Sequence, residues 1–146
     1  MAPLRLHASL QDGGLTVEVH NLGAAAVRLW QRDNSWGWSM FSLRLQPAAG
    51  GATHQLVAAP VRRTRNVPRA LDLPAGSKLV FRFAAGDPVW TGWHPDDVWL
   101  LQPLQVGVEL TIAPTPEATE QQVSAGRWQA EECLSPPPHR WLTGTR

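Results

Sequence analysis

The sequence of 146 residues contains no tyrosine, one cysteine and one lysine. Because Cys133 is alone, the chain forms no internal disulfide framework and no cysteine metal cluster. No stretch reaches the roughly 18 apolar residues that a membrane helix needs, so we expect no membrane association. The first residues, MAPLRLHASL, alternate in polarity instead of forming the apolar run of a secretory signal. We therefore expect a cytoplasmic protein.

Charge and motifs exclude further classes of function. The chain has 13 basic and 12 acidic residues, and a net charge of +1 gives no general attraction to nucleic acid. It has no serine elbow and no glycine-rich phosphate loop. Cys133 lies beside Glu131 and Glu132, which makes it a poor nucleophile. We expect no enzyme, with no catalytic residues, cofactor or metal.

Period-two alternation of apolar and polar residues dominates the chain and is typical of strands with one buried face. Two such runs flank the QDGG turn at 11–14 and predict a hairpin. Further runs occupy 26–30, 41–45, 54–60, 78–83, 104–112 and 126–134. Turn residues every eight to fifteen positions predict an all-β fold, an antiparallel immunoglobulin-like β-sandwich of seven to eight strands.

The remaining segments are a single expected helix and the C-terminus. Thr115 suits an N-cap, Pro116 the first turn and Gly126 a stop, so the helix is expected near 116–125 on the surface. We expect residues 1–134 to form one domain. Residues 135–146, which include SPPPHRW, are expected to form an extended Pro-rich tail.

The alternation also predicts which residues form the core. These inward positions are Val17, Val19, Leu43, Phe81, Phe83, Val106, Val108 and Leu110. Trp30 ends a run opposite Val27 and Leu29, so it is expected to be exposed.

The stretches LTVEVHNLGAAAVRLW, MFSLRLQ and LPAGSKLVFRF resemble immunoglobulin-like bacterial sandwich domains. They are most similar to intracellular proteinase inhibitors of the BsuPI type, through a strand that ends in Asn and a Pro-Gly turn before a Phe-bearing strand. The resemblance covers roughly residues 15–84.

Two kinds of segment are candidates for binding. Eight tryptophans are more than one small core needs, and Trp36, Trp38, Trp90 and Trp93 fall in turn-rich segments. Loops cluster at the ends of a sandwich, so these rings form either an exposed aromatic platform or a plug that closes one end. In the first case, Trp36 is the exposed anchor and Trp38 packs inward.

The second kind is the segment VRRTRNVPR, the densest charge cluster of the chain. Its residues Arg62, Arg63 and Arg65, with Arg69, could hold phosphate or a carboxylate-rich partner, or the segment could be a solvated loop.

Three functions remain open. The leading hypothesis is a non-enzymatic protein-binding sandwich, an inhibitor or an accessory subunit with a protein partner, and a homo-oligomer is left open. The alternative is a carbohydrate-binding module that uses the tryptophan loops. The third is a small enzyme at His94, with Asp96 and Asp97, or a metal site at His7 and His20, which supply only two of the four ligands of structural zinc.

Overall fold

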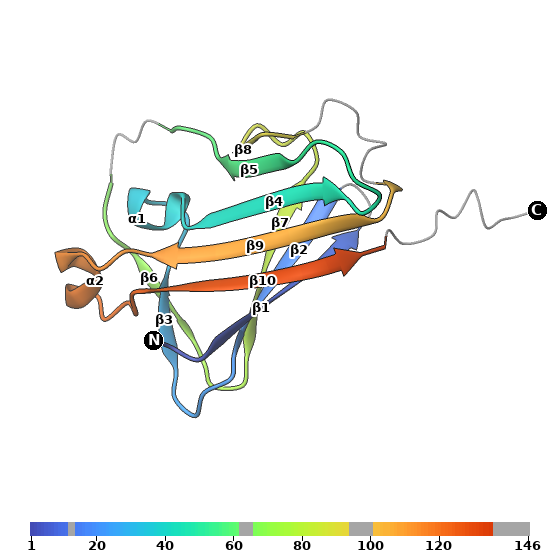
Figure 1. Cartoon of the computed structure of the whole chain (residues 1–146). Coiled ribbons are helices and arrows are strands. Elements are labelled where there is room, and N and C mark those ends of the chain that lie inside the picture. Colours follow the sequence, from blue (N-terminus) through green and yellow to red (C-terminus); the bar gives the residue numbers. More distant parts are fainter. Residues whose placement is uncertain (12–13, 62–65, 94–100, 136–146) are drawn as a thin grey trace, which may run out of the picture.

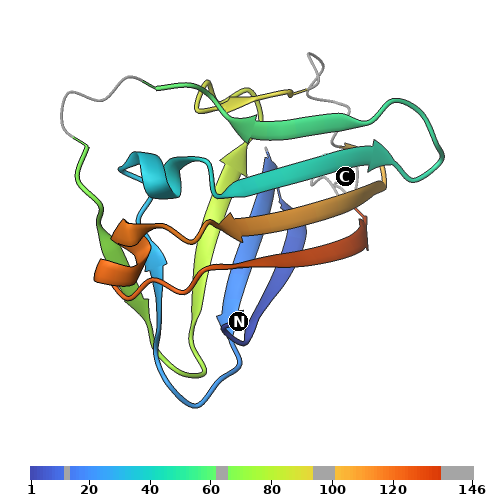
Figure 2. The ribbon, with the colours of Figure 1, turned by 60° about the vertical axis from the view of Figure 1, so that its left-hand side comes forward.

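The computed structural model describes residues 1–11, 14–61, 66–93 and 101–135. Two antiparallel sheets pack against each other, which confirms the predicted all-β sandwich (Figure 1). The strands of the larger sheet run across those of the smaller one (Figure 2). The expected Pro-rich tail lies almost entirely outside the described residues.

The smaller sheet has the order β1-β2-β7. Its strands are β1 (Leu4–Gln11), β2 (Gly14–Asn21) and β7 (Lys78–Ala84). The predicted hairpin pairs β1 with β2, from Leu4 opposite Asn21 to Gln11 opposite Gly14. A short two-stranded ribbon joins β3 (Val27–Trp30) to β6 (Ala70–Leu73).

The larger sheet has the order β10-β9-β4-β5-β8. Its strands are β4 (Phe41–Pro47), β5 (His54–Ala58), β8 (Trp90–Thr91), β9 (Leu104–Ile112) and β10 (Gly126–Leu134). The described residues thus contain ten strands, whereas seven to eight were expected. The additional strands are β6 and β8, which have four and two residues, and β8 is too short to show an alternating pattern.

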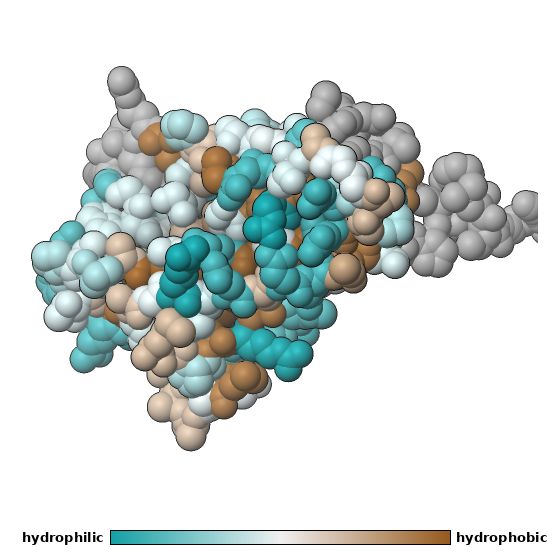
Figure 3. All heavy atoms as spheres, viewed as in Figure 1, coloured by the Kyte–Doolittle hydropathy of each residue, from teal (hydrophilic) through white to brown (hydrophobic). Residues whose placement is uncertain are grey.

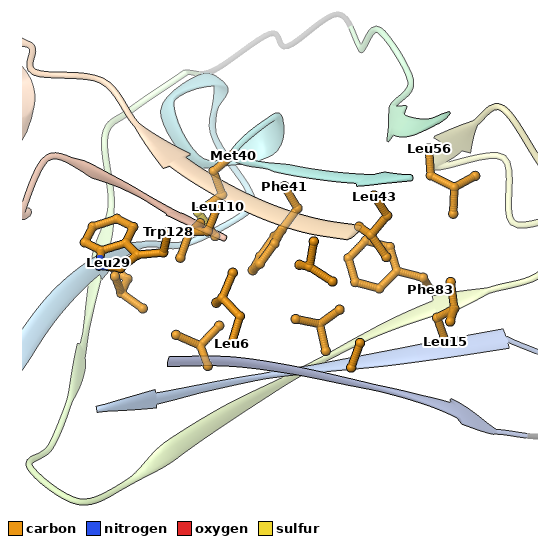
Figure 4. Packing of buried hydrophobic residues seen from close by; sticks show 14 of the residues in the cluster. Leu6, Leu15, Leu29, Met40, Phe41, Leu43, Leu56, Phe83, Leu110 and Trp128 are labelled. Carbon is orange, nitrogen blue, oxygen red and sulfur yellow. The ribbon is translucent and has the colours of Figure 1, made fainter. Parts of the chain in front are cut away.

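The core lies between the two sheets, where side chains of both inner faces meet (Figure 4). Seven of the eight predicted core residues are buried; they are Val17, Val19, Leu43, Phe83, Val106, Val108 and Leu110. The eighth, Phe81, faces inward and stacks on Phe41 with ring centroids 4.7 Å apart, but it is only half-buried. The predicted register is therefore correct, while the burial predicted for Phe81 is too high.

The turn between β2 and β3 and the turn between β6 and β7 meet at Asn21, which is 1% exposed. Its amide nitrogen donates to the carbonyl oxygens of Ala25 at 2.9 Å and Leu73 at 3.0 Å. Its amide oxygen accepts the backbone N–H of Gly23 at 2.9 Å. One side chain thus satisfies three backbone groups from both turns, and the chain bends there from the smaller sheet into the ribbon (Figure 1).

One open edge of the sandwich is fastened by Glu132 of β10. Its carboxylate accepts the backbone N–H of Ala8 in β1 at 2.5 Å and bonds the ring of His7 at 2.7 Å. The carboxylate uses a backbone donor at the edge of β1, so the outermost strands of the two sheets are joined by side-chain chemistry.

Two short helices complete the fold. Helix α2 (Pro116–Glu120) begins as predicted, with the Thr115 side chain accepting the N–H of Ala118. It ends well before Gly126, because Gln122 has a φ of 58°, which no helix accommodates. Helix α1 (Ser35–Trp38) was not expected. Neither helix of the described ranges is long and apolar enough to cross a bilayer.

Replacing Asn21 with alanine should destabilise the protein by about 2–4 kcal/mol, because buried backbone groups lose their partners. Urea unfolding measures the change. The exposed Asn66 serves as a matched control, and Asn66→Ala should cost less than about 1 kcal/mol. Equal costs for the two variants would contradict the role of Asn21.

Candidate functional site

The segment 31–39 folds tightly around Asn34, which has no exposed surface. Its side-chain oxygen caps α1 by accepting the N–H groups of Trp36 at 3.1 Å and Gly37 at 3.2 Å. A Cβ atom at Gly37 would lie 1.9 Å from the carbonyl oxygen of Gln31 and 2.8 Å from the Cβ atom of Trp30. Only glycine permits this approach, so α1 lies directly on the end of β3.

Trp36 and Trp38 leave α1 toward different elements. The indole N–H of Trp36 donates to Glu117 of α2 at 3.2 Å, and its ring lies 6.0 Å from that of Trp30. The indole N–H of Trp38 donates to the carbonyl oxygen of Ala59 at 2.6 Å. Both rings are half-buried, so Trp36 is not the fully exposed anchor that we expected.

Arg32 joins Trp38 to Trp90 of β8. Its guanidinium carbon lies 4.3 Å from the ring centroid of Trp90 and 5.1 Å from that of Trp38. Its Nη2 also donates to the carbonyl oxygen of Trp38 at 3.0 Å. A planar cation between two aromatic faces gains cation–π attraction from both, most strongly where water is excluded. No sequence pattern marks Arg32 for this role, because its ring partners come from two other elements.

The residues that flank the arginine segment are bonded to the same region. Asn66 accepts the backbone N–H of Ser35 at 2.9 Å and donates to its hydroxyl at 2.6 Å. Arg69 donates to Asp33 at 2.9 Å. The candidates Arg62, Arg63 and Arg65 lie outside the described residues, but both of their described flanks contact the segment of Trp36 and Trp38.

The segment of Trp90 and Trp93 reaches this region through β5. The backbone of Ala59 donates to Val89 at 2.8 Å, and Ala58 pairs with Trp90. Trp90 is 4% exposed and stacks on Phe83 with centroids 4.3 Å apart, while Trp93 is half-buried. Three candidate segments therefore meet at one place, which we call the tryptophan end: residues 31–39, the described flanks 59–61 and 66–69 of the arginine segment, and residues 89–93.

The tryptophan end combines a packed interior with apolar side chains at its surface. Trp30, predicted to be exposed, is 2% exposed, because α1 covers it. Trp90 closes this end of the sandwich, and each described tryptophan is buried or half-buried. Beside them, Val61 and Val67 are 50% and 60% exposed. The arrangement offers apolar contact area with a polar rim, not a flat row of bare rings.

The histidines of the first hairpin bind carboxylates of the chain itself. The register sets His7 opposite Glu18 and His20 opposite Arg5, so the two rings are diagonal neighbours. His7 is bonded to Glu132, and His20 is bonded to Glu18 at 2.9 Å. Among the described residues, no group of three or more histidine, cysteine or acidic side chains is placed to hold a metal ion. The triplet of His94, Asp96 and Asp97 lies outside these residues.

Polar and charged side chains also cover the outer face of the larger sheet. Gly107 leaves a hollow there, bridged by the ion pair of Arg44 and Glu131, and a Cβ atom at Gly107 would collide with this pair. Beside it, Glu109 accepts hydrogen bonds from Arg127 and Gln129, both at 2.8 Å. Figure 3 shows hydrophilic side chains gathered on this face. The ones named here satisfy one another, which fits a structural network better than a binding site.

Comparisons with protein families, curated proteins and solved structures found no match to this chain. The resemblance to BsuPI-type inhibitors therefore stays a prediction.

Arg32→Met should destabilise the protein by about 1–2 kcal/mol, because methionine keeps the apolar contact but loses the cation–π attraction and the hydrogen bond to the carbonyl oxygen of Trp38. Urea unfolding provides the measurement. Arg28→Met is the matched control, since Arg28 only approaches Asp72 at 3.7 Å, and its cost should stay below about 0.5 kcal/mol. If Arg32→Met were as stable as the control, the stack would contribute nothing.

The hydrogen bonds from Arg127 and Gln129 hold the pKa of Glu109 below its ordinary value of 4.5. A lowered folded pKa gives stability that is present above 4.5 and is lost as the pH falls below it. Unfolding at acid pH is favoured because Glu109 takes up a proton more readily in the unfolded chain. Glutamine cannot take up this proton, so the stability of the Glu109→Gln variant should fall less than that of the wild type between neutral and acid pH. Urea midpoints across this range test the prediction, and parallel curves would contradict it.

Proposed function

We propose that the chain is a non-enzymatic protein-binding β-sandwich that acts as an inhibitor or an accessory subunit. The observation that supports this proposal is the convergence of the three candidate segments at the tryptophan end. Aromatic anchors held in place by packing, with apolar and arginine side chains beside them, are typical of the centre of a protein interface.

The chemistry of the tryptophan end favours a protein over a sugar as its ligand. A sugar-binding platform needs the open face of at least one ring, whereas Arg32 lies over the ring of Trp38 and the half-buried ring of Trp36 packs beside Trp30. Val61 and Val67 offer apolar area to a partner surface. The arginines at 62, 63 and 65 lie between these valines in the sequence, so an acidic rim on the partner would complement them.

The test is capture of partners on the immobilised chain, quantified by mass spectrometry. Val67→Glu should remove the proteins captured by the wild type, because it places a charge in an apolar contact. Replacing Arg62, Arg63 and Arg65 with serine should weaken capture and reduce its salt dependence. Melting temperatures should stay within about 2 °C of the wild type in both cases, so that lost capture is not lost stability; Val67 itself is an exposed position.

Leu22→Glu is the matched control, because Leu22 is 63% exposed but lies at the opposite corner, beside Asn21. It should capture the same partners as the wild type. The proposal fails if Val67→Glu captures them equally well, or if Leu22→Glu loses them to the same degree. Binding to a panel of oligosaccharides, without any captured protein, would favour the carbohydrate-binding alternative.

A further inference from the structure

Strand β7 forms one edge of the smaller sheet. Figure 2 shows it beside β2, with β1 on the far side of β2. Every second residue of an antiparallel edge strand directs its N–H and C=O groups away from the neighbouring strand. Outside the ladder with β2, the backbone groups of residues 79–83 make no hydrogen bond to any described residue. This edge is therefore a template for one further strand.

The inner side of β7 leaves apolar surface next to this edge. Leu79 and Phe81 pair with Val19 and Val17, which are fully buried, yet both remain half-buried themselves. The difference arises because β2 has a strand on each side, whereas β7 has a neighbour on one side only. An added strand with apolar side chains facing inward would cover Leu79 and Phe81.

The outer side of β7 is basic. Lys78 and Arg82 flank Val80, which is 53% exposed. Lys78 donates to Glu18 at 2.9 Å, and this hydrogen bond, with that from His20, lowers the pKa of Glu18. Arg82 forms no ion pair with any described carboxylate. An acidic side chain on the outer side of an added strand would pair with Arg82, and a second would add to the charge neutralisation of Lys78.

We propose that the edge of β7 binds an extended acidic segment of a partner protein as an added strand. Acidic and apolar residues alternate in this segment, the acidic ones facing Lys78 and Arg82 and the apolar ones facing Leu79 and Phe81. Backbone hydrogen bonds supply affinity in this mode of recognition, and the alternating side chains supply specificity. The edge lies on a different element from the tryptophan end, so the inference is independent of the function proposed above.

Two other occupants fit the edge less well. The C-terminal segment SPPPHRWLTGTR has no acidic residue, and its prolines cannot donate to a ladder. A second copy of β7, paired antiparallel about Val80, would set Lys78 opposite Arg82, and like charges at directly opposite positions destabilise a sheet. An acidic partner avoids both difficulties.

The probe is a capped peptide of alternating valine and glutamate with the length of β7, 7 residues. Nuclear magnetic resonance of the labelled full chain should show slowed hydrogen exchange for amides of residues 79–83 when the peptide binds. Arg82→Glu should weaken binding by about tenfold, because attraction becomes repulsion. Arg5→Glu is the matched control, an exposed arginine on β1 without an ion pair to a described residue, and it should change affinity by less than about twofold.

A peptide of the same sequence with N-methyl groups on one edge separates strand addition from general attraction between charges. It keeps every charge but cannot complete the ladder, so it should not bind to the wild type. The proposal is overturned if this peptide binds as well as the unmethylated one, or if Arg82→Glu binds as tightly as Arg5→Glu. A dimer that protects the same amides without peptide would assign the edge to a second copy. Val67→Glu should bind the peptide like the wild type, whatever its effect on the tryptophan end.

Discussion

The buried amide of Asn21 is the constraint on which the arrangement of the other elements depends. Since it satisfies backbone groups of two turns, both chain segments reverse direction at the same corner. The ribbon of β3 and β6 then leaves the smaller sheet and extends along one side of the sandwich (Figure 1). Trp30 at the end of β3 is thereby positioned under α1, so the corner also determines where the tryptophan end forms.

At the tryptophan end, stability and the proposed binding depend on the same side chains. The rings of Trp36 and Trp38 are fixed on one side by hydrogen bonds to α2 and to Ala59. Arg32 fixes Trp38 from the other direction, against a buried Trp90. Fixed rings lose little conformational entropy on binding, so a partner can gain from their remaining exposed area. As a consequence, the amino-acid composition of these loops does not show which tryptophan rings are needed for folding and which are available for binding.

The sequence predicted features that depend on local chemistry. The inward positions of β2, β7 and β9 and the beginning of α2 at Thr115 follow from alternation and capping, and they are confirmed. Features that depend on distant contacts were missed. Helix α1 uses Asn34 as a cap, but asparagine, serine and glycine also favour turns, so composition could not distinguish the two. Likewise, Trp30 is buried by α1, an element that the alternation of β3 does not include.

A net charge of +1 says little about recognition, because the local surroundings of the described sheet edges differ from one another. The edge of β1 is bonded to Glu132, and part of β5 is paired with the short β8. Beyond the ladder with β2, residues 79–83 of β7 have no backbone hydrogen bond to any described residue, and Lys78 and Arg82 lie on the outer side of this strand. On the larger sheet, the basic residues Arg44 and Arg127 each have an acidic partner. On the smaller sheet, Arg82 has no ion pair with any carboxylate that the structure describes, so its surroundings are locally basic although the whole chain is nearly neutral. The positive charge of Arg82 opposes pairing with a second copy of β7, because Arg82 would lie opposite Lys78. The same charge favours an acidic strand. Arg82 therefore both limits self-association and selects the partner.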